Sequence, residues 1–185
     1  MKGARHILAI DPGTSMGVAR WEAPAAIWSD TERLEGATVG QRLHHARAYL
    51  GRKFAAFEAR SRPIDLVVIE DFHATGFARG EGNAKSNEFL TMLRGVLIEV
   101  SEAYRVPYAM VPAATWRKTF LGYGRAPKGS KGFPWKAKAV ARCAALGWAP
   151  NRHDEAEALG ILFHARTRAQ PSFGVEATPL FSGAA

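Results

Sequence analysis

Cysteine is almost absent from this chain of 185 residues, and the single Cys143 excludes an internal disulfide. Neither this cysteine nor the six histidines show the spacing of zinc ligands. No apolar run approaches the roughly 18 residues that a membrane helix needs. The first five residues lead into a short apolar stretch that ends in an acid, which is unlike a signal peptide. We therefore expect a cytoplasmic protein that has no membrane partner.

Acidic residues are missing from one long stretch, because none occurs between Ala103 and His153. This stretch holds ten of the 25 basic residues, whereas the rest of the chain has 15 basic and 17 acidic residues, so the excess of +8 arises here. The ten are Arg105, Arg117, Lys118, Arg125, Lys128, Lys131, Lys136, Lys138, Arg142 and Arg152. Such asymmetry is expected of a protein that contacts a phosphate backbone. A solvated basic surface is the alternative interpretation.

The hydrophobic pattern predicts an α/β fold. Strands are expected at residues 5–11, 16–21, 25–29, 65–70 and 106–111, and helices at 38–60, 87–104, 113–121, 136–146 and 154–168. The strand–helix–strand order favours parallel pairing with right-handed crossovers, and hence a mixed sheet with helices on both faces. The length suits one domain, residues 1–170, followed by a loose C-terminal tail, residues 171–185.

Acids end two of the expected strands, at Asp11 and Glu70. Ligands of such sheets lie beyond the carboxyl ends of the strands, so neighbouring strands would place these acids side by side. The last helix opens with Asp154 and Glu157, which are three residues apart and project from one face of its first turn. Acids in a first turn also complement the helix dipole, and that explanation suffices for Glu155.

Four clustered carboxylates repel one another unless cations neutralise them. Oxygen ligands select Mg²⁺ or Mn²⁺, and two such ions can stabilise both the attacking and the leaving oxygen of a phosphoryl displacement. A phosphodiester substrate also fits the basic stretch. The residues therefore predict a nuclease with two divalent ions, held by Asp11, Glu70, Asp154 and Glu157.

The order of these motifs resembles that of RuvC-type Holliday-junction resolvases over residues 5–168. The similar stretches are Ile7–Thr14, Leu66–Glu70 with Phe72, Asn83–Gly95, Val111–Lys118 and Asp154–Leu159. The resemblance implies a ribonuclease-H-like fold with a mixed five-stranded sheet, a homodimer, and metal-dependent endonuclease activity on four-way or other branched DNA in recombination and repair. It carries the four acids over as metal ligands and adds Lys136 as a phosphate-contacting, catalytic lysine, with Lys138 as the competing match.

The chain also departs from the family pattern. Glu157 stands where the family usually has Asp, and the loop of residues 122–135 is long and basic. The aromatic residue that the family uses near the junction centre corresponds to Phe72 or Phe77, with His73 competing. The candidate nucleic-acid contacts are Arg117, Lys118, Arg125, Lys128, Lys131, Lys136, Lys138, Phe72 and His73. The pattern resembles phage-encoded relatives as much as the bacterial form, so the expected location is the nucleoid or the cytoplasm of a phage host.

Three other functions remain open at this point. The same fold could act on RNA or DNA ends, and the Asp-x-Gly-Thr turn also occurs in actin-like ATPases, which are usually longer and have a second lobe. A DNA-binding module without activity could use the acids as helix caps. Among the aromatic residues, Trp116 and Phe120 are four apart and expected in the core, whereas Trp135 is the better candidate for stacking on an unpaired base.

Overall fold

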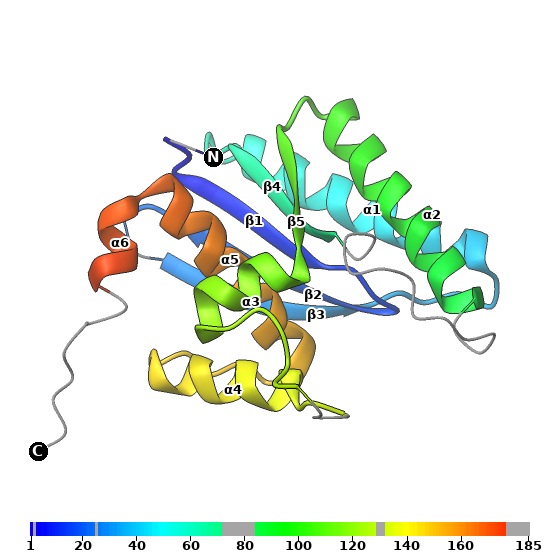
Figure 1. The fold of residues 1–185 in the computed structure, drawn as a ribbon. Helices are drawn as coiled ribbons and strands as arrows, with labels where there is room; N and C mark the ends of the chain where they lie inside the picture. The colour runs from blue at the N-terminus through cyan, green and yellow to red at the C-terminus, as the bar shows by residue number, and fades with distance from the viewer. Residues whose placement is uncertain (2, 25, 72–83, 129–131, 177–185) are drawn as a thin grey trace, which may run out of the picture.

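A five-stranded sheet in the order β3-β2-β1-β4-β5 forms the centre of the molecule (Figure 1). The computed structural model describes residues 1, 3–24, 26–71, 84–128 and 132–176. The strands are β1 (His6–Asp11), β2 (Ser15–Glu22), β3 (Ala26–Arg33), β4 (Leu66–Asp71) and β5 (Tyr108–Pro112). β1 pairs antiparallel with β2 and parallel with β4, while β3 joins β2 antiparallel and β5 joins β4 in parallel. The predicted mixed sheet is therefore confirmed.

Helices cover both faces of this sheet, as predicted (Figure 1). The helices are α1 (Val39–Glu58), α2 (Ala84–Ala103), α3 (Ala113–Leu121), α4 (Trp135–Ala145), α5 (His153–Ala169) and α6 (Pro171–Glu176). Side chains of β1 alternate between the two layers: Ile7 and Ala9 pack with α3 and α5, whereas Leu8 and Ile10 pack with α1 and α2. A strand buried on both faces explains the continuous apolar run in the sequence.

Several element boundaries differ from those predicted. β3 extends to Arg33, well beyond residue 29, because it pairs with the whole of β2 as far as Ser15. α2 begins at Ala84 instead of residue 87. α1 begins as its sequence indicates, since Thr38 caps it and forms a capping box with Gln41.

The predicted loose tail needs a correction, because its first residues, Pro171–Glu176, form helix α6. The ring of Phe173 packs on Phe163 at 5.2 Å between centroids, and the guanidinium of Arg166 lies 3.8 Å from the centroid of Phe173. This apolar and cation–π contact ties α6 to α5. Residues 177–185 lie outside the described residues.

Helix α5 lies against both the sheet and α3, and two glycines allow this close approach. A Cβ at Gly160 would come within 2.6 Å of the ring of Trp116, and one at Gly17 would collide with the backbone oxygen of Asp154. Any larger residue at either place would push the helix away. The start of α5 is thus fixed beside the ends of β1 and β2.

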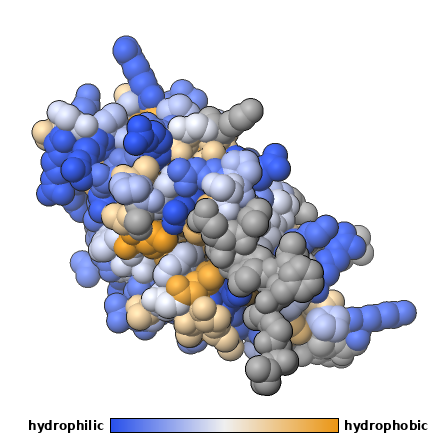
Figure 2. Space-filling model, turned by 90° about the vertical axis from the view of Figure 1, so that its left-hand side faces the viewer, coloured by the Kyte–Doolittle hydropathy of each residue, from blue (hydrophilic) through white to orange (hydrophobic). Residues whose placement is uncertain are grey.

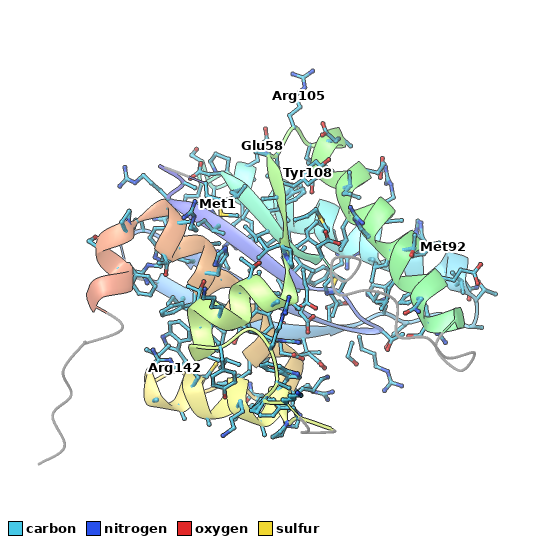
Figure 3. All side chains as sticks on the ribbon, viewed as in Figure 1. Met1, Glu58, Met92, Arg105, Tyr108 and Arg142 are labelled. Carbon is cyan, nitrogen blue, oxygen red and sulfur yellow. The ribbon has the colours of Figure 1, made fainter. Side chains whose placement is uncertain are left out.

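The polar surface and the apolar interior separate clearly. The face in Figure 2 is largely hydrophilic outside the residues drawn in grey, and its apolar residues form small separate patches. Within the described residues, no helix is both long and apolar enough to span a bilayer. At the amino end of β5, Arg105 and Tyr108 project outward, as does Glu58 at the end of α1 (Figure 3). This end of the sheet is opposite to the one where Asp11 and Glu70 lie.

Candidate metal centre

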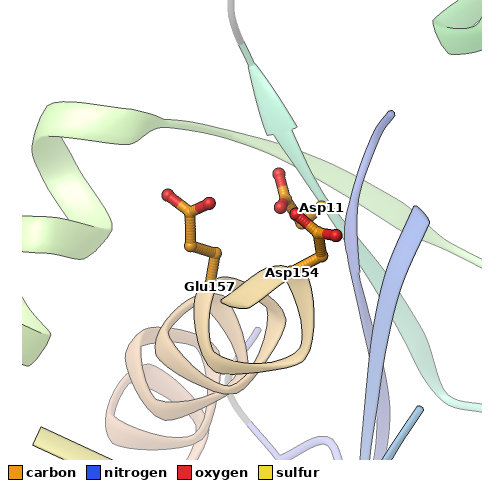
Figure 4. A group of neighbouring side chains, drawn as sticks. All are labelled: Asp11, Asp154 and Glu157. Atoms are coloured by element: carbon orange, nitrogen blue, oxygen red, sulfur yellow. The ribbon is translucent and has the colours of Figure 1, made fainter. Parts of the chain in front are cut away.

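Three of the four predicted acids converge at the carboxyl end of β1. One carboxylate oxygen from each of Asp11, Asp154 and Glu157 lies within 4.8 Å of the other two (Figure 4). Asp11 ends β1. The side chains of Asp154 and Glu157 rise from the first turn of α5 toward Asp11 (Figure 4). Spacing by three residues places both on one side of the helix. The cluster offers only oxygen ligands, the type that hard divalent cations prefer.

Glu70 lies beside this cluster and is held by a neighbouring indole. β4 runs parallel to β1 with Ile69 opposite Ile10, so Glu70 and Asp11 occupy the next positions of adjacent strands. The Nε1 of Trp116 donates a hydrogen bond of 2.6 Å to Oε2 of Glu70. Because the indole is fully buried, this bond fixes the orientation of the Glu70 carboxylate.

Two basic side chains reach the same acids. The Nζ of Lys136 lies 2.8 Å from Oδ1 of Asp154 and 3.7 Å from Oε2 of Glu157. A guanidinium nitrogen of Arg117 lies 3.4 Å from Oε1 of Glu157. These two cations balance half of the charge of the four carboxylates when all are ionised. The remaining double negative charge suits a divalent cation.

Burial and mutual repulsion change the acidity of the cluster. Desolvation raises the pKa of Asp11 well above its usual range, and the charges of Glu70, Glu157 and Asp154 raise it further. Desolvation also raises the pKa of Glu157 and of Glu70, although Lys136 opposes the shift at Glu157 and the Trp116 hydrogen bond opposes it at Glu70. The hydrogen bond to Asp154 raises the pKa of Lys136, which keeps its ammonium charged. A cation bound here would relieve the repulsion that these shifts express.

Several aromatic rings lie around the side chain of Arg117, next to the basic loop of residues 122–135. Its guanidinium lies 5.2 Å from the ring centroid of Trp116 and 4.7 Å from that of Trp135. Tyr123, Phe133 and Trp135 pack on one another with centroids 4.7–5.9 Å apart. Trp135 is the first residue of α4 and is partly covered by these neighbours. Stacking of Trp135 on a base stays a prediction, and the expected burial of Trp116 is confirmed.

The other predicted contacts either form no ion pair with these acids in the described structure or lie outside the described residues. Lys118, Arg125, Lys128 and Lys138 are exposed. Of the two competing lysines, Lys136 is the one that bonds to the cluster in the described structure. Phe72, His73, Phe77 and Lys131 lie outside the described residues.

The prediction that the helix dipole suffices to explain the position of Glu155 needs a correction. Its side chain is only 3% exposed and accepts hydrogen bonds from the hydroxyls of Ser29 and Thr31 at 3.2 and 3.4 Å. The backbone N–H of Asn151 donates a third bond of 3.1 Å. Ser29 and Thr31 are two apart in β3 and therefore point to one face, a signal that the shorter predicted strand concealed. The role of Trp116 beside Glu70 had no comparable signal in the sequence.

Comparisons with known proteins address the fold. No protein-family model matches the chain, and no curated protein matches it. The structure of Thermus thermophilus RuvC is 19% identical, with a TM-score of 0.62 over 89% of this chain and 97% of that one. T. thermophilus RuvC in complex with a Holliday junction substrate is 17% identical, with a TM-score of 0.66 over 91% and 97% of the two chains. With its strand order and covering helices, the chain therefore has the ribonuclease-H-like fold of RuvC.

Proposed function

We propose that this chain is a metal-dependent endodeoxyribonuclease that cuts four-way (Holliday) or other branched DNA junctions. The convergence of Asp11, Asp154 and Glu157 beside Glu70, at the carboxyl edge of a RuvC-like sheet, is the observation that carries the proposal. Acids that served only as helix caps would not need to meet an acid from β1. The neighbouring Lys136 and Arg117 suit a substrate with negative charge on its backbone.

The donor set fits two Mg²⁺ or Mn²⁺ ions, which Asp11, Glu70, Asp154 and Glu157 would hold. Such ions lower the pKa of a bound water and offset charge on the leaving oxygen of a phosphodiester. The longer side chain of Glu157, which replaces the Asp of the family pattern, still brings an oxygen into the cluster. Its neighbour Arg117 limits where that carboxylate can point.

Lys136 and Arg117 have a second task in this proposal. Without other cations they bind the carboxylates, and the side chain of Lys136 remains 58% exposed. When bound metal ions balance the charge of the acids, both basic side chains become available to a backbone phosphate. Their contacts with Asp154 and Glu157 then exchange for contacts with the DNA strand.

Branched DNA as the substrate is supported by the RuvC complex with a Holliday junction, which has this fold. Paired nicks on a four-way junction need two active sites related by a two-fold axis. The described residues of one chain form one such cluster of acids. We therefore include a symmetric homodimer in the proposal.

A substrate panel tests this function. The purified chain is given a labelled four-way junction, a linear duplex of the same sequence and a single strand, each with Mg²⁺, Mn²⁺ or EDTA. We expect paired nicks in the junction alone, and none in EDTA. Equal cutting of all three DNAs, or of an RNA-containing duplex alone, would favour a nuclease with another substrate. ATP hydrolysis without nicking would contradict the nuclease altogether.

A further inference from the structure

A polar pocket of about 480 Å³ lies at the same edge of the sheet as the metal centre, toward the edge strand β3. Three arginines, Arg33, Arg42 and Arg152, line it together with Thr14 and Ser15. We call it the arginine pocket. Arg33 and Arg42 lie outside the basic stretch of residues 103–153, so the charge pattern of the sequence does not reveal this site.

The fold assembles the pocket from three separate parts of the chain. Arg33 ends β3, where it pairs with Ser15 of β2, and Arg42 lies in the first turns of α1. Arg152 immediately precedes α5. The backbone N–H of Leu34 donates to the carbonyl of Thr14 at 2.9 Å, which closes the turn that follows β1. Only the folded chain brings these three guanidinium groups to one hollow.

The pocket and the metal centre share two chain segments. Thr14 follows Asp11 in the turn after β1, and Arg152 precedes Asp154 at the start of α5. The close approach of Gly17 to the backbone of Asp154 holds these two segments together. A ligand in the arginine pocket would therefore lie in a fixed relation to the acids.

The charge of the pocket selects an anion. Three arginines face one carboxylate, that of Glu35. Arg33 and Arg152 are exposed, and neither has an acid within ion-pair distance in the part of the chain that the structure describes. The Nε of Arg42 donates to the carbonyl of Gly36 at 2.9 Å, which orients its guanidinium. Planar arginine forks of this kind match the oxygens of a phosphate.

The spacing of the strands limits how far this phosphate lies from the acids. β3 lies two strands from β1, so their backbones are roughly 10 Å apart, given about 4.8 Å between neighbours. One strand of duplex DNA advances about 3.4 Å along the axis per phosphate. The arginine pocket is thus within a few nucleotides of the acids along such a strand. Arg117, in the helix that follows the other edge strand β5, flanks the acids on the opposite side.

We propose that the arginine pocket binds a backbone phosphate of the DNA strand, within a few nucleotides of the cleaved bond. This inference rests on the proposed nuclease function and deepens it, because it gives the DNA strand a path across the site. The strand passes from Arg117 and Lys136, over the acids, to Arg33 and Arg152. The basic side chains on the two sides of the acids then hold the DNA strand on both flanks of the scissile bond.

Single charge-removing variants test the pocket. Arg33→Gln and Arg152→Gln are compared with Arg60→Gln, which makes the same chemical change at an exposed arginine just after the end of α1, at the opposite end of the sheet. The dissociation constant of a fluorescent four-way junction is measured by anisotropy in EDTA at 50–200 mM KCl. Each pocket variant should weaken binding roughly three- to tenfold and lower the slope of log K against log[salt] by about one. Arg60→Gln should match the wild type.

A variant with the opposite sign controls for misfolding. Glu35→Gln removes the single acid of the pocket and should tighten binding about two- to threefold, which a damaged fold cannot do. Arg33→Lys should retain the salt slope while losing part of the affinity, because it keeps the charge without the planar fork. Far-UV circular dichroism melts confirm that the variants are folded.

The outcomes separate this inference from the proposed function. Unchanged slopes in Arg33→Gln and Arg152→Gln, with a wild type that binds and nicks junctions, would overturn the pocket alone. Wild-type protein that neither binds nor nicks any DNA would remove both. Calorimetry with inorganic phosphate identifies the other source of this ligand. Phosphate binding lost in Arg33→Gln, with junction binding unchanged, would make this a small-anion site and overturn the inference.

Discussion

The first turn of α5 carries acids with two different environments. Asp154 and Glu157 face Asp11 and two basic side chains, whereas Glu155 faces the hydroxyls of β3 on the other side of the helix. Glu155 is satisfied by neutral donors and needs no cation. The other two acids are clustered with like charges, and such a cluster is favourable only when positive charge balances it.

This contrast separates an acid with a structural role from the acids that we propose as metal ligands. Burial alone does not, since Glu155 and Glu157 are 3% and 6% exposed. The partners decide: hydroxyl and backbone donors complete one carboxylate, while the other repels its neighbours and raises their pKa values. The two sides of α5 should therefore respond in opposite ways to the loss of a charge.

The largest effect is expected from Asp11→Asn. Loss of the central carboxylate should lower junction cleavage at least about 10³-fold, because metal-ion catalysis supplies several kcal/mol of transition-state stabilisation. In EDTA the variant should melt roughly 2–4 °C higher than the wild type, since about 1 kcal/mol of repulsion is relieved. Gel assays of nicking and melting in EDTA measure the two effects. A variant that cuts normally would remove Asp11 from the metal centre.

Trp116→Phe should have the next largest effect. It removes the donor to Glu70 and keeps a large aromatic ring in the core. Partners that orient metal ligands typically change affinity or activity by about 10- to 100-fold, so the Mg²⁺ concentration for half-maximal cleavage should rise by such a factor.

Trp148→Phe is the matched control, because Trp148 stacks on Phe120 in the same core layer. It should lower thermal stability without moving the Mg²⁺ midpoint. Equal Mg²⁺ midpoints for the Trp116 and Trp148 variants would show that the indole of Trp116 has only a packing role.

Glu155→Gln tests the structural side of the comparison. The change weakens three hydrogen bonds to a buried carboxylate, at a cost of about 1–2 kcal/mol, or a melting temperature roughly 2–8 °C lower. Cleavage per folded molecule should stay within about twofold of the wild type. A loss of cleavage comparable with that of Asp11→Asn, in folded protein, would assign Glu155 to the reaction.

The smallest effect concerns pH. Burial raises the pKa of Asp11 above its unfolded value near 4, so its favourable contribution is present below that value and is lost as pH rises through the folded pKa. Metal-free wild type should therefore lose stability relative to Asp11→Asn as pH increases from 4 to 8. The stabilisation by Mg²⁺ should grow over the same range, because protons no longer compete. Stronger Mg²⁺ stabilisation at pH 4 than at pH 8 would contradict this linkage.

Much of the candidate site could be predicted because its signals are local. An acid that ends an apolar strand marks both Asp11 and Glu70, and helical spacing places Asp154 and Glu157 on one face. The parallel pairing of β1 and β4 followed from the element order. Lys136 came from the resemblance; the structure places its Nζ 2.8 Å from Oδ1 of Asp154, and its contact with a phosphate stays a prediction.

Other features depended on residues that are distant in the sequence. The bond from Trp116 to Glu70 joins residues 46 positions apart, and the bonds of Glu155 join α5 to β3 across more than 120 positions. No local pattern encodes such contacts, because they depend on how the helices pack on the sheet. The arginine pocket is hidden for the same reason.

The sequence by itself determined the strand and helix pattern, the acids at the ends of elements and the basic stretch, since periodicity and charge are properties of neighbouring residues. Only the tertiary structure decided which acids share a cluster and which are satisfied elsewhere. Packing through Gly17 and Gly160 brings α5 against β2 and Trp116, and this sets the direction of every acid in its first turn. The same packing places Arg152 beside Arg33, because hollows and charge clusters are formed by surfaces that meet only in the folded chain.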